Sequence, residues 1–271
     1  MRAALETLRS LLFVPANDQR KLAGAAARGA DAVIVDLEDA VAADEKAGAR
    51  ATAASALAAM PAGPLRMLRV NAAGSAFHGG DVALLDGLEL DAVVLPKATP
   101  AGLAAVGASG VPVLALVETA EGLRGSHEIA SHPAVFALML GAADLAADLG
   151  LTPREDGLEI LHARSKLVLD SRAAKIRAPF DGVHLALDDA DGLLARARLA
   201  RTLGMRGMGC IHPSQIAIVH AAFAPQESEL AWARRVIAAA GCDSGARALD
   251  GMLVDAAILA RARAILAEVG D

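Results

Sequence analysis

The sequence predicts an α/β fold built on parallel strands. Apolar segments of strand length recur along the chain, and the stretches between them have the apolar period of helices. Such alternation is typical of a parallel sheet covered by helices. We expect eight strands, at residues 11–15, 32–38, 65–71, 92–97, 111–119, 135–141, 182–187 and 206–212. Eight strand–helix units in about 250 residues predict a (β/α)8 TIM barrel. A doubly wound sheet is less well supported, because no GxGxxG follows the first strand.

Two further helical segments follow the eighth expected strand. They span residues 226–241 and 255–269, and the linker between them, 241–251, is polar and contains glycine. We therefore expect a TIM barrel over residues 1–223 and a C-terminal helical extension over 224–271. A helical extension beyond a complete barrel can form a lid or pack on a neighbouring subunit.

Composition excludes several classes of function. The net charge is -6 and only 2% of the residues are aromatic, so the chain lacks the basic face and the stacking platforms of a nucleic-acid-binding protein. The start of the sequence does not resemble a signal peptide, and no apolar run is long enough for a membrane helix. The two cysteines, Cys210 and Cys242, form no CxxC pair. We expect a cytoplasmic protein with no membrane partner.

Polar side chains follow the expected strands at the end where TIM barrels carry their active sites. Asp36, Glu38 and Asp39 come at the end of the second strand, Arg69 at the end of the third, and Lys97 at the end of the fourth. Asp36 and Glu38 either hold Arg69 or Lys97 in place, or contact a substrate or metal directly. Asp39 could instead cap the helix that follows.

Two acids stand alone at the ends of neighbouring strands. Glu118 follows the fifth strand and Asp144 follows the sixth. Two adjacent carboxylates repel each other unless a cation lies between them. Oxygen ligands with open positions suit Mg²⁺, which keeps waters or substrate oxygens in its shell. The spacing is therefore compatible with a Mg²⁺ site, and equally with a structural ion pair to Arg69.

Seven short motifs occur in an order that resembles a known family. They are RSLLFVPAN, DAVIVDLEDAV, RVN, DAVVLPK, ALVETAEG, LMLGAADLAADLG and GCIHPSQI, and the similarity runs from about residue 8 to residue 268. In this order they resemble the citrate lyase β-subunit-like acyl-CoA lyases of the HpcH/HpaI aldolase superfamily. The resemblance implies a TIM barrel, Mg²⁺ as cofactor, and homotrimers or hexamers.

The resemblance also implies roles for individual residues. Arg69 of RVN would bind substrate oxygens and stabilise negative charge, and Glu118 and Asp144 would ligate Mg²⁺. An acid from the C-terminal segment of a neighbouring subunit would complete the site, and Asp255 is the residue that matches it. Asp255 also suits the N-cap of the helix that follows it.

The chemistry implied is the cleavage of a β-hydroxyacyl-CoA thioester, of the malyl-CoA or citramalyl-CoA type, to an acyl-CoA and a 2-oxo acid. Mg²⁺ would hold the oxygens of the oxo acid, Arg69 would stabilise the developing anion, and Asp255 would move a proton at the enolate carbon. Backbone N–H groups of Gly141, Ala142 and Ala143 could bind the substrate carboxylate, because small residues allow close approach.

Two other functions remain open from the sequence. The runner-up is a citrate lyase β subunit, which cleaves a citryl thioester to oxaloacetate within a multi-subunit complex. A non-catalytic barrel that binds CoA or a protein is the alternative from another class, and the presence of Arg69, Glu118 and Asp144 together argues against it.

Overall fold

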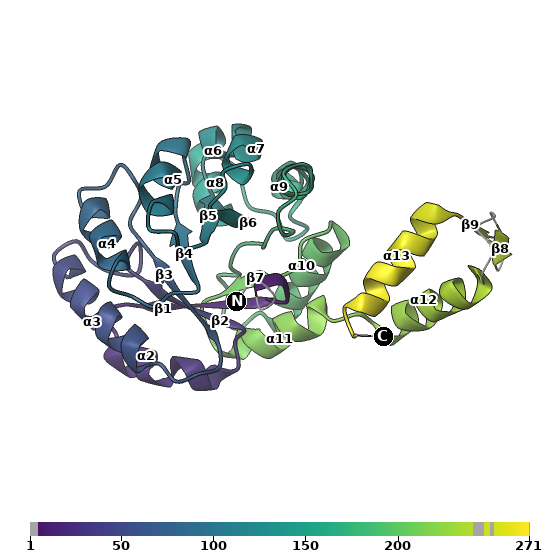
Figure 1. Cartoon of the computed structure of the whole chain (residues 1–271), viewed down its shortest axis with the longest axis horizontal. Coiled ribbons are helices and arrows are strands. Elements are labelled where there is room, and N and C mark those ends of the chain that lie inside the picture. The colour runs from purple at the N-terminus through teal and green to yellow at the C-terminus, as the bar shows by residue number, and fades with distance from the viewer. Residues whose placement is uncertain (1–4, 241–246, 250–251, 271) are drawn as a thin grey trace. The chain divides into compact units, whose positions relative to one another are not determined.

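The computed structural model describes residues 5–240, 247–249 and 252–270 (Figure 1). The chain divides into two compact units, residues 1–223 and residues 224–271. The linker predicted at 241–251 lies largely outside the described residues, as does Cys242. No described helix has the length and apolar character needed to cross a membrane.

The first unit is built on a parallel sheet of seven strands (Figure 1). Their order in the sheet is β6-β5-β4-β3-β2-β1-β7, so each strand from β1 to β5 pairs with the next one along the chain, and β7 pairs with β1. The strands are β1 (Ser10–Pro15), β2 (Ala32–Asp36), β3 (Leu65–Arg69), β4 (Ala92–Leu95), β5 (Val113–Val117), β6 (Val135–Leu140) and β7 (Met208–Cys210). This arrangement confirms the predicted α/β class with a parallel sheet.

Helices connect the strands, as parallel pairing requires. The connecting elements are α2 (Gln19–Ala25), η1 (Ala26–Arg28), α3 (Lys46–Ala59), α4 (His78–Leu85), α5 (Pro100–Gly107), α6 (Ala120–Arg124), α7 (Ser126–Ala130), α8 (Ala142–Leu149), η2 (Leu158–Ile160), α9 (Leu161–Ala173), α10 (Ala190–Thr202) and α11 (Ser214–Phe223). Side-chain caps start several of them. Thr99 accepts a hydrogen bond from the Gly102 N–H at the start of α5, and Thr119 accepts one from the Gly122 N–H at the start of α6.

The prediction of a closed barrel of eight strands is wrong at residues 182–187, which form no strand. The segment just before them lies between β6 and β7 instead, with isolated bridges from Met139 to Phe180 and from Asp181 to Met208 and with backbone hydrogen bonds to both edges. The apolar residues that suggested a strand, Leu185 and Leu187, are 63% and 51% exposed. Their alternation therefore reflects a partly apolar loop and not a buried strand.

A buried ion pair holds the bridging segment. Asp181 is fully buried, and its carboxylate lies 3.0 Å from Nη2 of Arg164, which is 1% exposed. Nε of Arg196 lies 3.4 Å from the same carboxylate. Removing one partner of such a pair leaves an uncompensated buried charge, so the ion pair adds to the backbone hydrogen bonds that hold the segment between β6 and β7.

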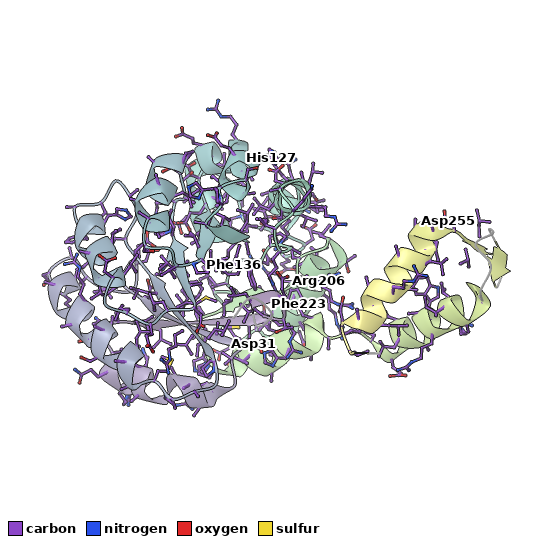
Figure 2. The ribbon with its side chains drawn as sticks, in the orientation of Figure 1. Asp31, His127, Phe136, Arg206, Phe223 and Asp255 are labelled. Atoms are coloured by element: carbon purple, nitrogen blue, oxygen red, sulfur yellow. The ribbon has the colours of Figure 1, made fainter. Side chains whose placement is uncertain are left out.

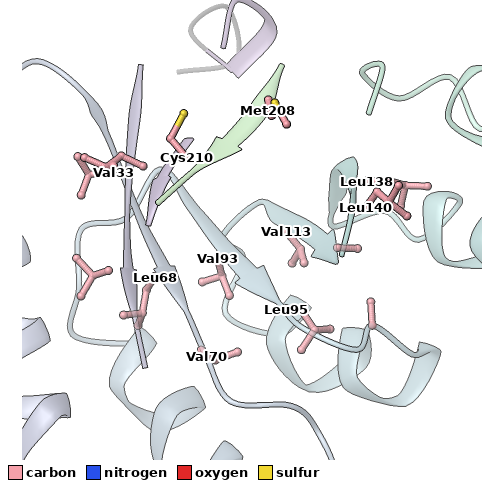
Figure 3. Close-up of a cluster of buried hydrophobic side chains, with 14 of the residues drawn as sticks. Val33, Leu68, Val70, Val93, Leu95, Val113, Leu138, Leu140, Met208 and Cys210 are labelled. Carbon is pink, nitrogen blue, oxygen red and sulfur yellow. The ribbon is translucent and has the colours of Figure 1, made fainter. Parts of the chain in front are cut away.

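Alternating side chains of the strands enter two separate cores. One core lies between the sheet and its helices and includes Val33, Leu68, Val93 and Leu138 (Figure 3). The other contains the residues that alternate with these, such as Ile34, Met67, Val94, Leu116 and Met139. Successive residues of a strand point to opposite faces, so the second core fills the inner, concave side of the sheet. Each fully buried side chain of this size contributes roughly 1.5–3 kcal/mol.

The second unit is a pair of helices joined through a short hairpin. It contains α12 (Glu227–Ala240), β8 (Arg247–Leu249), β9 (Met252–Val254) and α13 (Ala256–Ala267), and β8 pairs with β9 in antiparallel fashion. Leu230, Val236 and Ile265 belong to a hydrophobic cluster of its own. The guanidinium of Arg261 lies 5.0 Å from the ring centre of Trp232. The unit therefore has its own packing, separate from the cores of the sheet.

Candidate functional site

The polar residues predicted at the strand ends belong to one layer of the concave side. Because side chains alternate along a strand, the residue two positions after an inner apolar residue points to the same side. Asp36 follows Ile34, Arg69 follows Met67, Glu118 follows Leu116 and Gly141 follows Met139 in this way. Parallel strands bring their carboxyl ends to one edge, so these residues gather above the inner core.

Arg69 is held by three carboxylates. Its Nε and Nη2 donate to the two oxygens of Asp36, each over 2.6 Å, and its Nη1 lies 2.8 Å from Oε2 of Glu38. Nη1 also reaches Asp39 at 3.4 Å, and the guanidinium lies 5.2 Å from the ring centre of Phe13. Burial acts to lower the pKa of Arg69, but the hydrogen bonds and charge of Asp36 raise it above its ordinary value. The guanidinium is therefore a permanent, oriented cation.

Glu38 connects Arg69 with Lys97. Its Oε1 accepts a hydrogen bond of 2.9 Å from Nζ of Lys97, while its other oxygen faces Arg69. Burial raises the pKa of Glu38, and the charge of Arg69 opposes that shift. Asp36 and Glu38 thus contact Arg69 and Lys97, as one of the two interpretations of these acids predicts. The capping role considered for Asp39 is wrong, because Glu45 and not Asp39 stands at the N-cap position of α3.

Glu118 is a buried carboxylate in a fixed orientation. It is 2% exposed, and its Oε1 accepts a hydrogen bond of 2.8 Å from the backbone N–H of Lys97. Burial, then the charge of Glu38, raises the pKa of Glu118 to about 7, and the N–H of Lys97 only partly offsets this rise. A cation close to Glu118 would stabilise its ionised form.

Asp144 reaches the same place from the first turn of α8. Its carboxylate is 42% exposed, and its Oδ1 lies 3.7 Å from Nζ of Lys97. Nζ of Lys97 is also 3.9 Å from Oε1 of Glu118. The two acids predicted as metal ligands thus face one common cation. Glu118 and Asp144 were also considered as partners of Arg69. Among the described residues no such ion pair occurs, and the cation next to both acids is Lys97.

The donor set fits a magnesium ion with most of its shell left open. Five carboxylates of the strand ends, Asp36, Glu38, Asp39, Glu118 and Asp144, accompany the two cations Arg69 and Lys97. Negative charge is therefore in excess at this edge when the acids are ionised. No cluster of three or more His, Cys, Asp or Glu side chains suitable for a metal occurs among the described residues. Two carboxylates suit Mg²⁺, which retains waters or substrate oxygens, better than an ion that needs a protein cage.

The backbone after β6 differs in part from the prediction. The N–H of Gly141 donates to the carbonyl of Val117 over 3.0 Å, so it is engaged in the sheet and is not available to a substrate carboxylate. Ala142 and Ala143 are the first two residues of α8, where N–H groups have no acceptor within the helix. These two remain suitable for binding an anion.

A cavity of about 680 Å³ opens over these residues. Arg69, Glu118 and Asp144 line it, together with Ala142 and Ala143. This volume exceeds what a small oxo acid alone would fill, so the cavity suits a larger ligand.

The same cavity has a second, different wall. Lys21 of α2 and Arg28 of η1 line it, along with the exposed apolar side chains of Leu185, Leu187 and Ile211. Sequence reasoning did not single out these residues, because Lys21 and Arg28 lie in ordinary helical patterns. The one signal that could have indicated them is that both lie in the helical segment that follows the first strand.

Asp255 lies in the C-terminal unit, at the start of α13 (Figure 2). Its Oδ1 accepts hydrogen bonds from the N–H groups of Ala257 and Ile258, each over 3.0 Å. The N-cap interpretation is therefore confirmed. Both bonds use the same oxygen of the exposed carboxylate, so the cap leaves Oδ2 for another partner.

The profile of the HpcH/HpaI aldolase/citrate lyase family matches residues 9–213. The chain belongs to this family. A citrate lyase subunit beta-like protein of Mycobacterium tuberculosis is 41% identical over 266 residues, covering 96% of this chain and 95% of the relative. A (3S)-malyl-CoA thioesterase of Cereibacter sphaeroides is 36% identical over 268 residues, covering 96% and 94%.

A solved structure resembles this HpcH/HpaI family member over nearly its whole length. It is the crystal structure of the protein CitE from Mycobacterium tuberculosis in complex with magnesium, acetoacetate and coenzyme A. The TM-score is 0.86 at 40% identity, and the match covers 98% of this chain and 99% of the other. The family predicted from the seven motifs is confirmed.

Proposed function

We propose that the protein is a Mg²⁺-dependent carbon–carbon lyase that cleaves a β-hydroxyacyl-CoA of the malyl-CoA or citramalyl-CoA type to an acyl-CoA and a 2-oxo acid. The observation that carries this proposal is the convergence of Arg69, Glu118 and Asp144 in one cavity. Similarity to a CitE structure that holds magnesium, acetoacetate and coenzyme A supports both the metal and the thioester.

Glu118 and Asp144 are the residues that would hold Mg²⁺. The ion would act as a Lewis acid on the oxygens of the 2-oxo acid portion. Both carboxylates face the same cation in the structure, and the surrounding strand ends carry more acids than bases. The chain's own groups therefore match a divalent cation in charge as well as in ligand type.

Arg69 is the group proposed to stabilise negative charge on the substrate. Of its five N–H donors, Asp36 takes two and Glu38 faces a third. Nη1 also reaches Asp39, so one donor on Nη2 remains for a substrate oxygen. Because Asp36 fixes the plane of the guanidinium, this donor and the positive charge are oriented before the substrate binds, which is the condition for electrostatic stabilisation of an enolate or alkoxide.

The substrate carboxylate and the thioester carrier would occupy different walls. The N–H groups of Ala142 and Ala143 suit the carboxylate of the 2-oxo acid portion. Lys21 and Arg28 suit the phosphate groups of coenzyme A, and the apolar side chains of Leu185 and Leu187 suit its uncharged arm. This division explains why one cavity combines a charged edge with an apolar wall.

In the cleavage direction the hydroxyl group gives its proton to a base, such as water in the open cavity, and the carbon–carbon bond breaks. The electron pair of that bond moves to the thioester portion as an enolate, and the former hydroxyl carbon becomes the ketone or aldehyde of the 2-oxo acid. A proton must then reach the enolate carbon. We propose Asp255 of a second copy as its donor, which requires self-association; a homotrimer or hexamer is the assembly we propose.

A citrate lyase β subunit is the second candidate, favoured by the similarity to a citrate lyase subunit beta-like protein. The test is a screen of malyl-CoA, citramalyl-CoA and citryl-CoA with Mg²⁺, with free thiol and 2-oxo acid measured separately. Oxo acid released with acyl-CoA, and no free thiol, supports the lyase. Thiol release without oxo acid indicates thioester hydrolysis instead. Activity only after association with other subunits favours the citrate lyase complex.

A further inference from the structure

Lys97 has a backbone conformation that side-chain-bearing residues seldom adopt. It stands two positions after β4 and has φ of 45°, in the left-handed region. Residues other than glycine persist in that region only where the surroundings fix them, and such positions concentrate at functional sites. The conformation aims the N–H of Lys97 at Oε1 of Glu118, over 2.8 Å. The backbone of Lys97 is thus already part of the support of a proposed metal ligand.

The ammonium group of Lys97 lies among three carboxylates but is hydrogen-bonded to one. Its Nζ is 2.9 Å from Oε1 of Glu38, which is hydrogen-bond distance. The separations from Asp144 and Glu118 are 3.7 Å and 3.9 Å, so those two acids are compensated by charge alone. Lys97 can therefore stay on Glu38 while another cation takes Asp144 and Glu118.

A cation in this position has two opposed effects. Without metal, it offsets the repulsion among Glu38, Glu118 and Asp144 and stabilises the folded chain. When Mg²⁺ enters between Glu118 and Asp144, the ammonium becomes a like charge at close range and opposes binding. Its side chain is 38% exposed, so solvent screens part of both effects.

We propose that Lys97 is a place-holding cation of the metal site: it keeps Glu118 and Asp144 together in the metal-free protein and weakens the binding of Mg²⁺. The proposal rests on the metal site of the proposed function. A weakly held metal ion can leave the site and be replaced. When it leaves, Lys97 keeps Glu118 and Asp144 in position. Lys97 is thus a positioning residue that sets metal affinity and does not touch the reacting atoms.

The test compares Lys97→Met with wild-type protein by titration calorimetry with MgCl₂ and by thermal unfolding. Lys97→Met keeps the length of the side chain and removes its charge. We expect Mg²⁺ to bind about tenfold more tightly, the metal-free melting temperature to fall, and the rise on adding Mg²⁺ to become larger. Lys97→Gln serves as a second neutral variant should Lys97→Met fold poorly. Lys175→Met removes a cation from a second left-handed residue, with φ of 60°, that does not line the cavity; it is the matched control and should leave Mg²⁺ affinity unchanged.

The outcomes separate this proposal from the metal site itself. A merely supporting side chain would give weaker or unchanged Mg²⁺ binding in Lys97→Met, and that result overturns the place-holding role while leaving the site intact. If wild-type protein binds no Mg²⁺, or if Glu118→Gln binds it as well as wild type, the metal site of the proposed function is wrong and this inference falls with it.

Discussion

Gly141 makes room for the carboxylate of Glu118. A Cβ at position 141 would stand 2.3 Å from Oε2 and 2.4 Å from Cβ of Glu118, closer than non-bonded atoms approach. The N–H of Gly141 meanwhile bonds to the carbonyl of Val117, so the backbone cannot easily retreat. Gly141 therefore leaves space for the side chain of Glu118. The sequence had instead suggested that its N–H contacts the substrate directly.

Gly141→Ala should displace Glu118 and weaken Mg²⁺ binding while the protein still folds. The acid must turn away from the new methyl group, and the two strand ends must also separate slightly, because rotation does not move Cβ of Glu118. The hydrogen bond of Glu118 to the N–H of Lys97 is then lost. Titration calorimetry measures the change. Gly48→Ala in α3 is the control, because a Cβ there meets nothing within 4 Å; it should leave metal binding unchanged and stabilise the fold by about 0.4–1 kcal/mol. Equal Mg²⁺ affinity in Gly141→Ala and wild type would contradict the packing argument.

The residues at the strand ends were predictable because parallel strands impose one rule on all of them. Asp36, Arg69 and Glu118 each follow an inner apolar residue by two positions, so their convergence follows from period and topology alone. Lys97 was expected at the same edge, but its left-handed backbone was not. Backbone strain at one residue depends on contacts from other strands, and a single sequence does not contain them.

The fold was predictable up to the place where the sheet ends. Val183, Leu185 and Leu187 alternate as in a strand, yet the chain bridges β6 and β7 through the residues just before them, such as Phe180 and Asp181. The buried partner of Asp181 is Arg164, from a helix earlier in the chain. A charge pair between a helix and a bridge has no periodic signal, so apolar alternation misplaced the segment. Lys21 and Arg28 were missed for a related reason. That both side chains line one cavity is visible only in the folded structure.

Glu118→Gln and Asp144→Asn should each weaken Mg²⁺ binding and abolish turnover. Both changes preserve shape and remove one negative charge from the proposed metal site. We expect the larger loss for Glu118→Gln, because Glu118 is buried and Asp144 is 42% exposed. Calorimetry with MgCl₂ measures the affinity, and circular dichroism checks the fold. Normal Mg²⁺ affinity in both variants rules out the pair as metal ligands.

The stability of the metal-free protein should fall between about pH 4.5 and pH 7. The folded pKa of Glu118 is about 7, above its ordinary value of 4.5, so over this range the folded state binds more protons than the unfolded state. The free energy of unfolding therefore decreases as pH rises, by up to about 3 kcal/mol. Urea unfolding at several pH values measures this slope. Glu118→Gln should flatten it, and a variant as steep as wild type would assign the effect to other groups.

Arg69→Lys should lower kcat by about 10²-fold or more with little effect on the fold. Lysine keeps one positive charge beside Asp36 and Glu38 but cannot reproduce the two parallel bonds of 2.6 Å that fix the guanidinium. Arg69→Ala is a poorer probe, because it leaves buried carboxylates unpaired and should cost about 3–5 kcal/mol. Steady-state kinetics on the best substrate of the screen decides the matter, and near-normal turnover of Arg69→Lys would mean that Arg69 is structural only.

Asp255 offers a variant that separates its two roles. Asparagine caps a helix about as well as aspartate, so Asp255→Asn should keep the bonds to the N–H groups of Ala257 and Ile258 and the melting temperature. It removes the acid, so turnover should fall sharply if Asp255 moves a proton. Asp255→Ala should lose the cap as well and cost about 1 kcal/mol. Full activity of Asp255→Asn would reduce Asp255 to a helix cap.

Mixing two inactive variants tests whether Asp255 acts from a second copy. Glu118→Gln disables the proposed metal site of its own chain, and Asp255→Asn disables the proposed proton donor. If Asp255 of one copy serves the metal site of another, exchange of subunits restores sites that combine an intact Glu118 with an intact Asp255. Random exchange should then recover about a quarter of the wild-type activity, since half of the metal sites and half of the donors are intact. If Asp255 instead serves its own chain, no site is restored, and absence of activity despite exchange shown by native mass spectrometry would exclude the role in trans.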